Sequence, residues 1–282
     1  MEKFNKIIYI VAIIFCTWLV KFVFHLPSLS IDIIGVVLSV ASILFGLLAG
    51  FFISQLLQRY TEIRSLQGER SSAGILLIEF AEHFYKKNPK FKKEFIKRME
   101  MSAVADEIIL WDEGHLEIPY YHKLEDSFES LTVSNAKDEV YFEGMLEQLN
   151  SYVTTTVKMD ALYKQRLAFT EWVVFVFLSI FISIAVLLLE PNQLFYIILI
   201  LTFPCVVLLT LSIIYDLNTI SMGRNLITLE PNQVIFDALG VRRFYMDRNK
   251  GSVSADLKHY RTEKSLKGDL RDILKSIEKS RK

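Results

Sequence analysis

The sequence has little cysteine and no excess of charge of either sign. Its two cysteines, Cys16 and Cys205, both lie in apolar runs, where a thiol behaves as a small hydrophobic side chain. Neither a disulfide scaffold nor a zinc site is therefore indicated. The 32 Lys and Arg residues balance the 32 Asp and Glu residues, so net charge does not point to nucleic acid as a partner.

The motifs of common enzyme classes are also missing, since there is no Walker loop and no GxGxxG, GxSxG or HExxH pattern. Carboxylates and histidines gather at two places, which are Glu79, Glu82 and His83, and Asp112, Glu113, His115 and His122. Acidic residues are abundant throughout this region, so a solvated helix face explains both groups better than a metal site. We predict no enzyme activity, no cofactor and no metal.

Long apolar runs dominate what is present. The chain is 52% hydrophobic and 23% charged, with a mean hydropathy of +0.32. Four runs hold almost no charge, at residues 7–26, 33–57, 172–189 and 194–215. About 20 helical residues cross a hydrocarbon core of roughly 30 Å, and the helix satisfies its own backbone amides there. The sequence therefore predicts an all-α integral membrane protein with four transmembrane helices.

The four runs form two predicted helical hairpins, because residues 27–32 and 190–193 are short connections. A secretory signal peptide is the alternative for the first run, which follows a short basic leader. No Ala-x-Ala cleavage pattern follows it, and bulky Ile14 and Phe15 precede Cys16. We therefore predict a retained span, with hairpins over residues 1–57 and 172–215.

The distribution of basic residues predicts the orientation. Apart from Lys21, every Lys and Arg lies in the leader, in residues 58–171, or after Tyr215. By the positive-inside rule both termini and the central region are cytoplasmic. Lys21 then lies near the outer interface, where a long side chain reaches the headgroups.

Residues 58–171 are predicted to form a cytoplasmic helical domain. Apolar residues recur at helical spacing, and the longest series is Met145, Leu149, Tyr152, Thr156, Met159 and Tyr163, which leads into the third span. Asn88 and Pro89 mark one break, and residues 114–119 mark another. No Gly or Pro interrupts residues 51–67, so the second span should continue into the cytoplasm as one long helix.

Residues 216–282 are predicted to form a basic cytoplasmic tail. From Arg242 onward, 13 basic residues stand against 6 acidic ones. An amphipathic helix is indicated by Leu266, Leu270, Ile273 and Ile277. The tail is expected either to contact anionic lipid or a neighbouring subunit, or to be a solvated terminus.

The second span carries a face of small residues at helical spacing: Gly35, Ser39, Ser42, Gly46, Gly50 and Ser54. One explanation is close helix packing, because small side chains let backbones approach in lipid. The other is that copies of this helix surround a pore, with Phe45 or Phe52 as an apolar constriction.

Two further features of the spans bear on transport. They contain no Asp, Glu or Arg, which argues against a proton-coupled pump. Pro204 interrupts the backbone hydrogen bonding of the fourth span, so a kink is expected there.

The order of features resembles the bestrophin-like domain family, a group of largely uncharacterised bacterial membrane proteins. The resemblance is carried by three sets of residues: Gly46 to Phe51 with Gln58, Arg59, Tyr60, Arg64 and Glu69; Ala105, Asp106, Glu107, Trp111, Gly114, Arg166, Leu167 and Trp172; and Asp216, Leu217, Asn218, Gly223, Leu229, Glu230 and Pro231. One departure is that Ser221 and Met222 stand where a Pro and an aromatic residue are expected.

The resemblance implies four spans, a helical cytoplasmic domain, a bacterial plasma membrane and kinship with bestrophins, which are pentameric anion channels. The Arg-Trp signature and acidic calcium clasp of bestrophins are not recognisable, so calcium gating is not implied. We therefore expect an oligomeric ion channel, anion-permeable, with the second span around the axis. The alternative is a non-conducting membrane scaffold or sensor that oligomerises and binds cytoplasmic partners.

Overall fold

The computed structural model describes residues 31–111, 124–188, 194–218, 230–244 and 260–261. Within these residues the regular structure is helical and no strand forms, apart from one isolated bridge between Phe244 and Arg261. The predicted first span, the connection between the second pair of spans, the second cytoplasmic break and the amphipathic tail helix lie outside the described residues.

The longest element is α2, Ile31–Tyr85, a single helix of 55 residues. The prediction that the second apolar run continues as one helix is therefore confirmed. The chain divides into two compact units, and their boundary falls inside this helix, between Gln58 and Arg59. Each unit is described below by itself.

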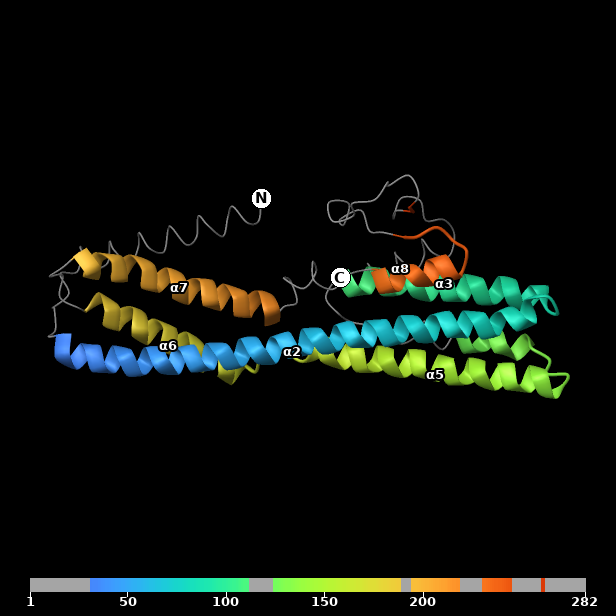
Figure 1. The fold of residues 1–282 in the computed structure, drawn as a ribbon, viewed down its shortest axis with the longest axis horizontal. Helices are drawn as coiled ribbons and strands as arrows, with labels where there is room; N and C mark the ends of the chain where they lie inside the picture. Colours follow the sequence, from blue (N-terminus) through green and yellow to red (C-terminus); the bar gives the residue numbers. More distant parts are fainter. Residues whose placement is uncertain (1–30, 112–123, 189–193, 219–229, 245–259, 262–282) are drawn as a thin grey trace. The chain divides into compact units, whose positions relative to one another are not determined.

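The first unit comprises residues 1–58 and 166–222, and its described helices are the first part of α2, α6 (Phe169–Leu187) and α7 (Leu194–Asn218). Helix α6 packs against α2 through Phe175, whose ring stacks on Phe45 with centroids 4.7 Å apart. Trp172 of α6 meets Tyr215 of α7 with ring centroids 6.4 Å apart. The helices of this unit are drawn in Figure 1.

The path from α5 (Ala136–Lys164) into α6 is broken at residues 165–168, which are not helical. The sequence leads from one apolar series into the next, so this break was not expected. Three of its backbone groups are bound by side chains. Leu167 N–H donates to Asn218 Oδ1 at 2.8 Å, and Ala168 N–H donates to Glu171 Oε2 at 2.7 Å. Arg59 donates to the Gln165 carbonyl.

The second unit comprises residues 59–165 and 223–282. Its helices are the rest of α2, α3 (Pro89–Trp111), the short 3-10 helix η1 (Asp126–Ser130), α5 and α8 (Glu230–Ala238). The predicted break at Asn88 and Pro89 is confirmed, and Asn88 Oδ1 caps α3 by accepting from Phe91 N–H at 3.0 Å. Its aromatic core is built from Phe84, Phe91, Phe95 and Phe128.

Helix α8 was not expected from the mixed pattern after the fourth apolar run. It packs on α3, and the buried side chain of Gln233 makes two hydrogen bonds to the backbone of Phe244. Arg261 contacts this region, pairing with Glu100 of α3 and donating to the Arg242 carbonyl at 2.8 Å. These contacts hold residues 244 and 261 against the α3 and α8 helices.

Candidate functional site

The predicted small-residue face of α2 is open in the described structure. Ser39, Gly46, Gly50 and Ser54 are exposed, and Gly35 and Ser42 are half-buried. A Cβ atom added at any of the three glycines would meet no neighbouring atom within 4 Å. The rest of the described chain therefore leaves this face uncovered.

The two predicted constriction residues lie on a different side of α2. Phe45 is 7% exposed and Phe52 is 5% exposed. Phe175 of α6 contacts both rings, with centroids 4.7 Å from Phe45 and 5.7 Å from Phe52. In this structure the two rings contribute to packing between α2 and α6, and their placement gives no support to a constriction.

Large apolar side chains flank the small-residue face, and the most exposed are Leu47 at 67% and Val36 at 65%. On α6, Phe177 is 68% exposed. Side chains of this kind are stable when lipid or another protein surface covers them. By length and composition, two helical stretches are able to cross a membrane: Ile34–Tyr85, and Ala136–Val186, which covers α5 and α6.

Pro204 and Cys205, which the sequence singled out in the fourth apolar run, lie in α7, whereas Cys16 and Lys21 lie outside the described residues. The helix continues through Pro204, which is buried. The kink at this proline stays a prediction. Cys205 is half-buried and forms no disulfide with any described residue.

The sequence pointed to His83 as part of an acidic group, but its partner in the structure comes from another helix. His83 Nε2 lies 2.9 Å from Oδ1 of Asp138, whose side chain is fully buried, and Lys87 binds the same oxygen. Bonds from Lys87 and His83 lower the pKa of Asp138, with a smaller contribution from Ser134 N–H. His83 also stacks on Tyr141, with ring centroids 4.0 Å apart and planes at 4°.

Glu79 and Glu82, the other members of that group, are exposed. Among the described residues no three His, Cys, Asp or Glu side chains are grouped to hold a metal ion. The second predicted group, from Asp112 to His122, lies outside those residues.

Sequence reasoning missed a second buried charge, Arg70 of α2, which is 1% exposed. Its guanidinium lies over the ring of Tyr152 at 4.9 Å and donates to the Tyr152 hydroxyl at 3.1 Å. Burial raises the pKa of nearby Tyr163, while the charges of Arg70 and Arg59 oppose that rise. The helical spacing of Tyr152 and Tyr163 signalled a buried face, but nothing in the pattern marked Arg70 as part of it.

These observations define an all-helical protein whose apolar helices are long enough to cross a membrane. Residues 7–219 match the family model of the bestrophin-like domain. The chain therefore belongs to the bestrophin-like family, as the sequence pattern suggested. A comparison with curated proteins finds no significant match.

Solved structures share the fold at low sequence identity. A crystal structure of a bacterial bestrophin homologue from Klebsiella pneumoniae has a TM-score of 0.57 and 12% identity, covering 86% of this chain and 99% of that one. A second crystal structure, described as that of a membrane protein, also has a TM-score of 0.57 and 12% identity, covering 84% of this chain and 98% of the other. At this identity the likeness shows the fold alone.

Proposed function

We propose that this protein is an oligomeric membrane ion channel, permeable to anions, in which copies of α2 surround a central axis. Membership of the bestrophin-like family supports the proposal, because bestrophins are pentameric anion channels. The open small-residue face of α2 is the observation that carries it. Gly35, Gly46 and Gly50 allow close approach around an axis, and Ser42 and Ser54 offer hydroxyl groups along it. The hydroxyl of Ser39 donates to the Gly35 carbonyl at 2.8 Å, so Ser39 offers its oxygen.

The proposed topology has spans at residues 7–26, 33–57, 172–189 and 194–215, with the termini and residues 58–171 in the cytoplasm of a bacterial plasma membrane. It is supported by the distribution of Lys and Arg. The helices of the second unit then form a cytoplasmic vestibule. The basic tail after residue 216 contacts anionic lipid. Reporter tags at residue 120 and at the carboxyl end should both report a cytoplasmic location, and an external location for either contradicts the topology.

Recording from purified protein in planar bilayers tests the channel directly. Gly46→Trp should reduce the single-channel conductance strongly, because it fills the open face. Leu47→Trp is the matched control, since Leu47 is the next residue, is 67% exposed and lies off that face. Its conductance should stay close to that of the unmodified protein.

Two results contradict the proposal. Purified protein that conducts at no tested voltage, pH or calcium concentration is one of them. The other is a nanodisc image that shows a sealed assembly with no axial path, which favours the alternative of a scaffold or sensor that binds cytoplasmic partners. A ring with an open axis supports the channel.

A further inference from the structure

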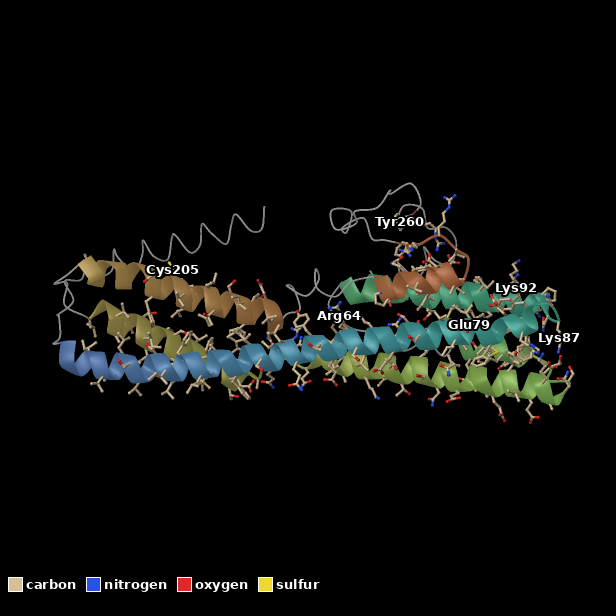
Figure 2. All side chains as sticks on the ribbon, in the orientation of Figure 1. Arg64, Glu79, Lys87, Lys92, Cys205 and Tyr260 are labelled. Carbon is tan, nitrogen blue, oxygen red and sulfur yellow. The ribbon has the colours of Figure 1, made fainter. Side chains whose placement is uncertain are left out.

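Helix α3 presents a row of exposed lysines. Lys90, Lys93 and Lys97 lie three and four residues apart, so they share one side of the helix, and all three are exposed. We call them the lysine face. Lys90 and Lys93 form no ion pair with any described residue. Lys92, labelled in Figure 2, adds positive charge nearby and contacts the Tyr85 ring.

Helix α5 presents a matching row of exposed glutamates. Glu139, Glu143 and Glu147 lie four residues apart on one side of the helix, and none of them pairs with a cation in the described part of the chain. We call them the glutamate face. Two exposed apolar side chains lie beside them, Val140 at 66% and Leu146 at 41% exposure. A surface that binds the glutamate face would remove these two side chains from water.

The two faces begin at the same end of the second unit. Phe91 in the first turn of α3 meets Phe84 of α2, with ring centroids 6.3 Å apart. Asp138 in the first turn of α5 binds His83 of α2 at 2.9 Å. Both helices therefore start beside the last turn of α2 and run away from it in the same direction, and Figure 1 shows them along opposite edges of α2.

The position of the lysines is unfavourable for their own helix. The amino-terminal end of a helix carries partial positive charge and favours acidic side chains. The first turn of α3 contains no acidic residue and holds Lys90 and Lys92 instead. Lys92 is accommodated by the Tyr85 ring, whereas Lys90 has no anionic partner among the described residues, and an anionic surface facing Lys90 would offset its unfavourable position.

We propose that the lysine face of one subunit binds the glutamate face of a second copy of this chain. The faces have opposite charge, start at the same end of the unit and extend over similar lengths of helix. In the heterologous form of this contact, the lysine face of each copy binds the glutamate face of the next, which gives a ring where the rotation between copies closes. The inference rests on the oligomer of the proposed function and supplies a contact between its subunits.

Charge reversal in full-length protein in nanodiscs tests this contact, with the assembly mass as the readout. The triple variant Lys90→Glu, Lys93→Glu and Lys97→Glu should raise the dissociation constant of the assembly about tenfold or more, since three attractive pairs become repulsive. Glutamates suit the start of α3, so this variant should keep its helical content. The reverse triple, Glu139→Lys, Glu143→Lys and Glu147→Lys, should weaken assembly similarly.

Assembly should recover when both triples are combined in one chain. Mixing the two variant chains should also restore assembly, in full in a ring with an even number of subunits, where the chains alternate, and in part in a ring of five, where one repulsive contact remains. The second recovery requires a contact between different chains. A matched control reverses three exposed cations elsewhere, Arg64→Glu, Lys158→Glu and Arg166→Glu, and should leave assembly unchanged.

Reversal of the lysine face without any effect on assembly overturns the inference, and so does a combined variant that fails to recover. Loss of binding to anionic lipid vesicles with unchanged assembly also overturns it, because the lysines then face a membrane surface. A wild-type ring that assembles through this contact but passes no current contradicts the proposed channel and leaves the contact standing.

Discussion

At the scale of single residues, two fully buried charges of the second unit, Arg70 and Asp138, have partners from another part of the chain. Asp138 of α5 is fully buried and binds Lys87 and His83, which both precede α3 in the chain. Removing one member of such a group leaves a buried charge without a partner. The resulting loss of stability is larger than the net stabilisation that the intact group provides. The group therefore specifies how α5 docks against the end of α2.

Acid should weaken this docking. The bonds from Lys87 and His83 hold the pKa of Asp138 below its ordinary value of 3.8. The folded state therefore favours the ionised carboxylate, and the resulting stability is fully present above about pH 4 and lost progressively below it. The melting temperature, followed by circular dichroism, should fall below that pH in the unmodified protein. Asp138→Asn should melt lower at neutral pH and lose less on acidification, and equal acid sensitivity in both proteins contradicts this role.

A second prediction at this scale concerns Gly144, where an added Cβ atom would lie 3.0 Å from the Phe80 ring. Gly144→Ala should lower the free energy of unfolding by about 1–3 kcal/mol because the ring has to move. Gly68→Ala is the control, since its Cβ meets nothing within 4 Å. That change should be neutral or stabilise by up to about 1 kcal/mol. Denaturant unfolding in detergent compares the two, and equal effects argue against crowding at Phe80.

At the scale of elements, sequence patterns predicted the helices that local signals define. The absence of Gly and Pro across residues 51–67 indicated the long α2, and Asn88 and Pro89 indicated the break before α3. The break at residues 165–168 could not be predicted, because neither Gly nor Pro marks it. Two of its backbone groups are bound by side chains distant in sequence, those of Asn218 and Arg59.

The candidate site was predictable to a similar extent. Helical spacing placed the six small residues on one face, and the structure leaves that face open. Spacing did not show that Phe45 and Phe52 face α6, because that depends on Phe175, more than a hundred residues further along the chain. Likewise, Lys90 and Glu143 read as ordinary solvated charges until the fold shows that their helices start together.

The hydrogen bond from the α5–α6 break to the side chain of Asn218 gives a prediction at the scale of elements. Asn218 is 7% exposed, and its side-chain oxygen accepts from Leu167 N–H at 2.8 Å. Asn218→Ala should destabilise the protein by about 1–3 kcal/mol because the part-buried N–H of Leu167 loses its acceptor. The control is Thr210→Ala, whose hydroxyl donates to Val206 O of its own helix and to no other described residue. A denaturation midpoint that is the same for both variants contradicts the capping role.

At the scale of the whole molecule, helix length and apolar exposure point to a bilayer. Helix α2 has 55 residues, whereas about 20 suffice to cross a hydrocarbon core. The rest of that helix carries the charged side chains of the second unit. Phe169 at 82% and Phe177 at 68% exposure lie on α6. Apolar surface on this scale is unfavourable in water.

The protein should therefore sediment with membranes and resist extraction by high salt or alkaline carbonate, because burial of apolar surface, and not ion pairing, holds it there. Detergent should release it. Immunoblotting of the sedimented and soluble fractions measures how the protein divides between them. Recovery in the soluble fraction without detergent contradicts the four-span topology and, with it, the proposed channel.

The parallel stack of His83 on Tyr141 has a consequence for spectroscopy. An aromatic ring 4.0 Å from an imidazole, with the planes at 4°, shields the imidazole protons by its ring current. The sequence contains 5 histidines, so the proton resonances of His83 should be shifted upfield and recognisable in a simple NMR spectrum. In Tyr141→Leu these resonances should return to ordinary chemical shifts, which would assign them to His83. In the unmodified protein they then report the docking of α5 on α2 without any attached label.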